Sequence, residues 1–467
     1  ILTEYHDRLD QPAVSDRRRK RLLDRLGTVF SDYRASVYEH GFTGKAMVST
    51  ATIVELCRVA GGYAAHSIRA NRRPSGLYHS YNLVAIEDDG RQMSVDPLPV
   101  MLEGQVAAIS SGLLSSEEVL VILDALYQSD LYRADQNSFV LYPARELPSF
   151  LERNKIAETD VAANPLLTRL LSAGDNTVIE RDALGHCRFS PEAASLTGLG
   201  DALDRLSADP DWTELVVAER TNMAELFESV FQHRRFTGRS GSMYKYEGLG
   251  SIYWHMVAKL LLAVQESFWS ARSAGEPEGV QSALAAGYYR IRAGLSSAKT
   301  PTEYGAFPTD PYSHSPVHMG AQQPGMTGQV KEEILTRWGE LGLRVKNGRL
   351  SFDPILLRSG EFLKEGTAWS YYDTSGAQQT IDLPPESLGF TYCQVPIIYR
   401  LGEPGIIVTW VDGGHDRMAG ATLDQETSDA LFRRLGTVTR IEVTLDQSLL
   451  AEDAPDDLIS VPPSSIR

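Results

Sequence analysis

Residues 234–266 read RRFTGRSGSMYKYEGLGSIYWHMVAKLLLAVQE, and residues 304–337 read YGAFPTDPYSHSPVHMGAQQPGMTGQVKEEILTR. Each stretch is a loop rich in Gly, Tyr, Ser, Gln, His and Pro that runs into a strongly patterned helix. Such loops build cores poorly, because so many polar groups beside glycine cannot all be buried. They suit a site for a polar, ring-shaped ligand, and we expect the rest of the chain to hold them in place.

Upstream of residue 342 the apolar residues recur mainly at helical spacing, which predicts about eleven or twelve helices in pairs joined by loops. Paired helices with long functional loops at one end favour an (α/α) toroid of the six-hairpin type over a four-helix bundle. We therefore expect residues 1–342 to form a toroid that carries the catalytic site. The predicted helices span 15–40, 47–70, 100–111, 116–129, 191–206, 212–232, 249–269, 275–295 and 328–340, with short helices in 148–169 and hairpins at 83–95 and 176–189.

After residue 342 the pattern changes to short runs of β-forming residues separated by Gly, Pro and Asp turns. This pattern predicts a β-sandwich or jelly roll for residues 343–467, and the fold class is then mainly α with a β-domain at the end. The predicted strands cover 349–356, 368–372, 379–383, 389–399, 405–411 and 438–445.

Charge and composition limit the partners. The chain of 467 residues carries a net charge of −16, which argues against nucleic acid or an anionic membrane as the main partner, since both demand a basic face. No apolar run reaches membrane length and no signal layout opens the chain. Three widely spaced cysteines favour a reducing, cytoplasmic location. The chain begins with Ile1 and has no initiator Met, so a domain upstream is left open. A homo-oligomer is left open as well.

The ligand type suggested by the two loops is a sugar. A sugar ring has apolar C–H faces and a rim of hydroxyls, so aromatic platforms beside planar polar side chains recognise it. For any single residue the alternative is core packing or helix capping. The residues expected to contact an oligosaccharide are Tyr78, His79, Arg133, Gln136, Arg239, Lys245, Tyr246, Trp254, His314, His318, Gln322 and Gln323.

Three carboxyl groups are equal candidates for a catalytic acid or base: Glu247, Asp135 and Asp310. Glu247 lies just before a predicted helix, where the alternative is a favourable charge at the helix N-terminus. Inverting hydrolysis needs an acid and a second carboxylate base ~6.5–9.5 Å away. Phosphorolysis needs only the acid, because phosphate is the nucleophile. The residue types leave both reactions open.

An anion site is predicted at Thr327, where free backbone N–H groups at the start of a helix could hold phosphate. The alternative is that Thr327 only caps the helix. His314 and His318 stand four residues apart, but Pro316 between them spoils a helical metal pair, so we expect no metal. The sequence shows no Gly-rich nucleotide loop and no nucleophile motif, and we expect no cofactor.

The end of the helical part resembles the inverting disaccharide phosphorylases of the cellobiose/chitobiose phosphorylase type. The likeness is carried by GMTG at 325–328, by LG at 341–342, by NGRLSFDP at 347–354 and by GEF at 360–362. The resemblance implies a toroid followed by a jelly roll, and it implies phosphate contact at Thr327. The Asp-Trp-Asn-Asp segment that carries the family's acid is not found, and Gln329, Glu332 and Glu333 differ from the family's small and aromatic residues.

These observations together predict a carbohydrate-active enzyme that cleaves or transfers glycosidic bonds of a glucan-like oligosaccharide, with inversion and in the manner of a phosphorylase. A glycoside hydrolase on the same scaffold is the first alternative. A non-catalytic sugar-binding or assembly subunit of a larger enzyme is the second. The partners of this protein would be the oligosaccharide and, for phosphorolysis, inorganic phosphate.

Overall fold

The computed structural model describes residues 1–6, 9, 14–42, 44–87, 90–143, 149–231, 252, 254–295, 299 and 327–451. The chain divides into two compact units. The first comprises Ile1–Tyr142, Ser251–Pro311 and Ser315–Arg467, and the second comprises Pro143–Gly250 with Tyr312–His314. The toroid, the β-sandwich and the domain boundary at residue 342 stay predictions.

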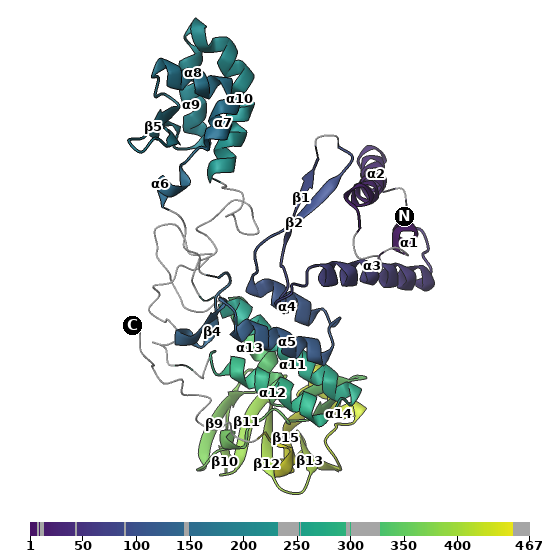
Figure 1. The fold of residues 1–467 in the computed structure, drawn as a ribbon. Coiled ribbons are helices and arrows are strands. Elements are labelled where there is room, and N and C mark those ends of the chain that lie inside the picture. The colour runs from purple at the N-terminus through teal and green to yellow at the C-terminus, as the bar shows by residue number, and fades with distance from the viewer. Residues whose placement is uncertain are drawn as a thin grey trace. The chain divides into compact units, whose positions relative to one another are not determined.

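Helix α11 (Trp254–Ala274) is the centre of the helical core in the first unit. It is buried on nearly all sides, because α4, α5, α12 and α13 pack around it (Figure 1). The sequence predicted a helix start at residue 249, but Ile252 instead forms a β-bridge with Val140. The surrounding helices are α4 (Leu102–Ser110), α5 (Ser116–Tyr127), α12 (Glu278–Arg292) and α13 (Thr327–Glu340).

Two N-terminal helices and a hairpin form where the sequence predicted them, and the short helix α1 was not predicted; together they bury little. The elements are α1 (Leu2–His6), α2 (Asp16–His40), α3 (Thr50–Ala70), β1 (Asn82–Ile86) and β2 (Met93–Pro97). Helix α2 has no buried residue, and the apolar face that predicted it includes the exposed side chains of Phe30 and Tyr33. Helical periodicity therefore located this helix without showing what its apolar face packs against.

The C-terminal part of the first unit is built on a five-stranded sheet with the order β11-β12-β15-β13-β14. Only the β12–β15 pairing is parallel; the other pairs are antiparallel. Two further antiparallel pairs, β7–β8 and β9–β10, accompany it. The strands are β7 (Leu343–Lys346), β8 (Arg349–Phe352), β9 (Thr367–Tyr372), β10 (Gln378–Leu383), β11 (Ser387–Tyr392), β12 (Val395–Leu401), β13 (Gly405–Trp410), β14 (His415–Met418) and β15 (Val438–Leu445).

Two features of this β region differ from the sequence prediction. The run 389–399 is two strands, because Cys393 and Gln394 take positive φ angles of 50° and 64° and reverse the chain. Such a turn usually carries Asn or Gly, so these residue types gave no turn signal. A helix, α14 (Gln425–Phe432), also stands among the strands, capped by the Asp424 carboxylate, which accepts from Thr427 N at 2.7 Å.

The second unit has a hydrophobic core of its own. Phe189, Phe227 and Phe231 pack ring against ring, and Leu166, Leu167 and Leu170 complete the buried face of α8. Its elements are α6 (Phe150–Arg153), α7 (Glu158–Ala163), α8 (Pro165–Ala173), β5 (Ile179–Arg181), β6 (Cys187–Phe189), α9 (Leu196–Ser207) and α10 (Pro210–Phe231). The predicted β-hairpin turn is confirmed at Gly185, whose φ is +87°.

Side-chain bonds join the helical core of the first unit to its β region. The Arg272 guanidinium pairs with Asp353 at 3.0 Å, and the Tyr289 hydroxyl donates to the carbonyl of Leu356. Among the helices in the described part of the chain, none has both the length and the apolar composition needed to cross a membrane.

Candidate functional site

A tight turn presents Asp135, one of the three predicted catalytic carboxylates. Strand β3 (Tyr132–Arg133) leads into a 3₁₀ turn η1 (Ala134–Gln136), and β4 (Ser138–Phe139) follows. Asn137 reverses the chain in the left-handed conformation, with φ of 45°, and its side-chain oxygen accepts from the Tyr132 hydroxyl at 3.0 Å. Asparagine tolerates this conformation better than most residues. The turn is therefore fixed from both its backbone and its side chains.

The Asp135 carboxylate is paired with Arg133. The two guanidinium nitrogens of Arg133 donate to its two oxygens at 2.7 and 2.5 Å, and the Asp135 side chain is 59% exposed. The hydrogen bond from Arg133 lowers the pKa of Asp135 below its ordinary value. A catalytic acid needs a raised pKa so that it carries a proton at the working pH. This direction of shift suits an ionised carboxylate better than a general acid.

The Asp135 turn lies near residues that border the two loops. One of them precedes the second loop, and another follows the first. Lys299, at the start of the second loop, donates from Nζ to the carbonyl of Gln136. The same Nζ lies 5.0 Å from the ring centroid of Trp254, the first residue of α11 after the first loop. Gly294, at the end of α12, approaches the turn so closely that a Cβ there would lie 1.8 Å from the Asn137 carbonyl oxygen. Two stretches that are distant in the sequence, one at Trp254 and one that carries Gly294 and Lys299, thus come together at this turn.

The first turn of α11 also reaches the beginning of α13, where the second loop ends. His255 Nε2 lies 3.6 Å from the buried Glu332 carboxylate, and burial lowers the pKa of His255. Further along, Gln265 Nε2 donates to the Thr336 carbonyl at 2.8 Å. The described residues therefore hold both ends of the second loop close to the end of the first, although the loops themselves lie outside the described residues.

A buried charge network lies further along α13. Glu340 is buried, with 3% of its surface exposed. Its carboxylate accepts a hydrogen bond from the Tyr288 hydroxyl at 2.6 Å and pairs with Arg292 at 3.2 Å and Arg337 at 2.8 Å. Arg337 pairs in addition with Glu361 at 2.7 Å. Sequence reasoning missed this network. The i, i+3 spacing of Arg337 and Glu340 on a predicted helix was the available signal.

Of the other predicted site residues, only some lie in the described part of the chain. Tyr78 is 3% exposed and packs in the helical core, where burial raises the pKa of its hydroxyl, and His79 Nδ1 lies 2.8 Å from the Leu98 carbonyl oxygen. Contact of these two residues with sugar stays a prediction. Thr327 opens α13 as expected, but its side chain is not described. The candidates outside the described residues are Glu247, Asp310, Arg239, Lys245, Tyr246, His314, His318, Gln322 and Gln323.

Among the described residues, no three or more His, Cys, Asp or Glu side chains gather where they could hold a metal ion. The acid–base and sugar-binding groups proposed from the loops are unaffected by this finding.

A comparison with known families identifies part of the chain. Residues 147–234 match the family described as GH149 phosphorylase insertion domain 2. The match falls inside the second unit, which begins at Pro143 and ends its main stretch at Gly250. No curated protein matches the chain. The match supports a glycoside phosphorylase-like family and a carbohydrate-active enzyme. It does not support the cellobiose/chitobiose type in particular.

Proposed function

We propose that the protein is an inverting glycoside phosphorylase that acts on a glucan-like oligosaccharide. The observation that carries the proposal is the match of residues 147–234 to a phosphorylase insertion domain. The structure adds that the same segment is a unit with its own core, set between two stretches that pack together in the first unit. The proposal includes a toroid with a β-sandwich and a cytoplasmic location.

In the proposed reaction one carboxylic acid protonates the glycosidic oxygen, while a phosphate oxygen attacks the anomeric carbon from the opposite face of the sugar. The glycosidic bond breaks, and the products are a sugar 1-phosphate of inverted configuration and a glucan shorter by one residue. Because Arg133 keeps Asp135 ionised, we assign the acid to Glu247 or Asp310. Asp135 then serves as a charged partner that orders the turn.

The phosphate in this proposal binds at the N-terminus of α13. The helix runs from Thr327 to Glu340, and its first backbone N–H groups have no partner within the helix. The helix dipole favours an anion at this end. Glu332 in α13 lies 3.6 Å from His255, and His255 directly follows Trp254, the aromatic residue expected to contact the sugar. Phosphate and sugar would then meet at the same place.

The test is phosphate-dependent release of sugar 1-phosphate from soluble glucan oligosaccharides by the purified protein. We expect turnover only with phosphate, and we expect Glu247→Gln or Asp310→Asn to reduce kcat by about 10²–10⁴. Asp135→Asn should retain far more activity than the variant that lacks the acid. Turnover without phosphate would replace the proposal with hydrolysis. Glucan binding without any turnover would replace it with the non-catalytic subunit.

A further inference from the structure

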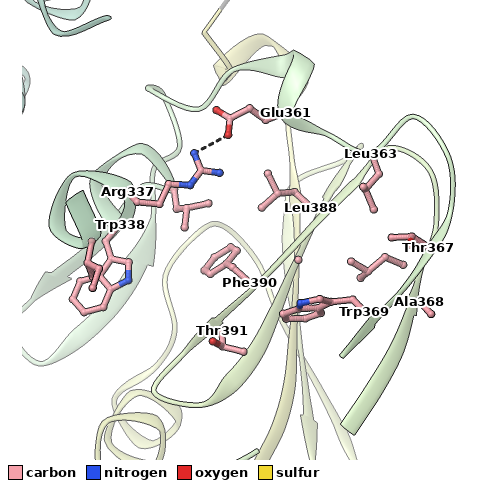
Figure 2. Close-up of a pocket in the computed structure, with 14 residues that line it drawn as sticks. Arg337, Trp338, Glu361, Leu363, Thr367, Ala368, Trp369, Leu388, Phe390 and Thr391 are labelled. Atoms are coloured by element: carbon pink, nitrogen blue, oxygen red, sulfur yellow. Dashed lines mark ion pairs between the residues drawn. The ribbon is translucent and has the colours of Figure 1, made fainter. Parts of the chain in front are cut away.

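A polar and aromatic groove lies where α13 meets the β region, and no residue of the Asp135 turn lines it. Its volume is about 610 Å³, within the range of about 300–1,000 Å³ typical of small-molecule sites. Trp338 lines it from α13, Trp369 from β9 and Phe390 from β11 (Figure 2). The groove is therefore built from three elements that are far apart in the sequence.

The two tryptophans are held in fixed orientations. Trp369 stacks on Tyr371 with ring centroids 5.3 Å apart and an angle of 28° between the rings. Trp338 meets Tyr392 edge-on at the same centroid distance of 5.3 Å. Gly389 makes room for Trp369, because a Cβ at position 389 would lie only 3.1 Å from the indole ring. Braced rings lose little freedom when a ligand binds, so the groove is pre-organised.

Polar groups complete the groove. The Arg337–Glu361 ion pair, at 2.7 Å, stands at one side in Figure 2, and the hydroxyl groups of Thr367 and Thr391 belong to the lining. The ion pair offers planar donors and acceptors, and the same guanidinium nitrogen of Arg337 also pairs with Glu340, which holds the arginine in place. A surface intended only for apolar packing would not need a charged pair and two exposed threonines.

We propose that this groove is a carbohydrate-binding site for a segment of a glucan chain, built from residues other than the candidate catalytic ones. Sugar rings have apolar faces that stack on indole and phenyl rings, and equatorial hydroxyls that bond to planar charged groups. The groove provides both within one cavity. The inference concerns binding alone, and it stands whether or not the protein carries out phosphorolysis.

The experiment is affinity electrophoresis of the full protein in native gels that contain a soluble β-glucan or, separately, a soluble α-glucan. We expect one of the two polymers to retard the protein. Trp369→Ala should weaken the apparent affinity about tenfold or more, as truncation of a central aromatic anchor does. Tyr372→Ala is the matched control, because this neighbour on β9 is 64% exposed and does not line the groove. It should be retarded like the unchanged protein.

A second variant tests the groove without the risk that Trp369→Ala simply fails to fold. Thr391→Arg adds a long side chain at an exposed position of an edge strand, where it fills the groove without removing core atoms. It should abolish the retardation but leave kcat/KM on a short oligosaccharide unchanged. Equal retardation of the unchanged protein and both groove variants would overturn the proposal. Failure of both polymers to retard the unchanged protein would overturn it as well.

Discussion

Replacing Glu340 with alanine should strongly destabilise α13. The side chain neutralises Arg292 and accepts the hydrogen bond of Tyr288, whose ring is fully buried. Arg337 keeps a partner in Glu361. Among the described residues, Arg292 keeps only Glu333 as an ion-pair partner, at 3.9 Å, and the Tyr288 hydroxyl loses its acceptor. Removing one partner of a buried charge network costs about 3–5 kcal/mol. We expect Glu340→Ala to reduce the free energy of opening of α13 by that amount.

The assay is native-state hydrogen exchange of the α13 backbone amides, followed by mass spectrometry. It reports the local free energy of opening and does not require the two units to unfold together. The matched control is Asp429→Ala, which removes an exposed carboxylate paired with Arg433 at 3.3 Å and should change stability by only about 0–1 kcal/mol. If exchange in α13 changes as little in Glu340→Ala as in the control, the network is not what stabilises this helix.

Three further predictions concern other parts of the chain. Phe227→Ala should destabilise the second unit by about 3–5 kcal/mol, because the fully buried ring packs on two others. Phe150 is exposed, so Phe150→Ala should cost far less. Equal urea midpoints for the two variants would contradict this. Burial lowers the pKa of His255 below its usual value of 6.5, so the unfolded chain binds more protons just below that pH. Stability should therefore fall as the pH drops from about 6.5 through the folded pKa, less steeply in His255→Gln, and urea titrations with equal slopes would refute it. Lys299→Met should lower kcat/KM about tenfold by freeing the Asp135 turn from Trp254, and unchanged kinetics would show that this contact is dispensable.

Secondary structure was the part of the fold most open to prediction, and the reasons are local. The helix predicted over 116–129 forms as α5, where Ser115 and Glu118 make a capping box, and the hairpin predicted over 176–189 turns at Gly185. The failures had non-local causes. Cys393 and Gln394 take a left-handed turn imposed by the pairing of β11 with β12, which nothing in their residue types announces. The exposed face of α2 shows the same limit, because periodicity cannot name the partner of an apolar face.

The candidate site stays a prediction from side-chain chemistry, and the contacts that hold its described residues could not be predicted. Aromatic and amide residues in Gly-rich loops indicated a sugar site from composition alone. No spacing rule links Lys299 to the carbonyl of Gln136, or Gly294 to Asn137, because these contacts depend on how helices pack. The pKa of Asp135 was equally out of reach, since it depends on Arg133 folding back across a turn two residues long.

The second unit is inserted in the sequence at a point where the chain of the first unit lies next to itself. The chain leaves the first unit after Tyr142 and returns at Ser251, and Val140 pairs with Ile252 across the gap. An insertion whose ends are already adjacent adds little loop-closure cost, which rises only slowly with length. The same bridge fixes Trp254 two residues later and the Asp135 turn a few residues earlier. The first loop of the site, residues 234–250, is therefore also the return connection from the inserted unit. A change in the inserted unit has a covalent route of few residues to the proposed acid at Glu247.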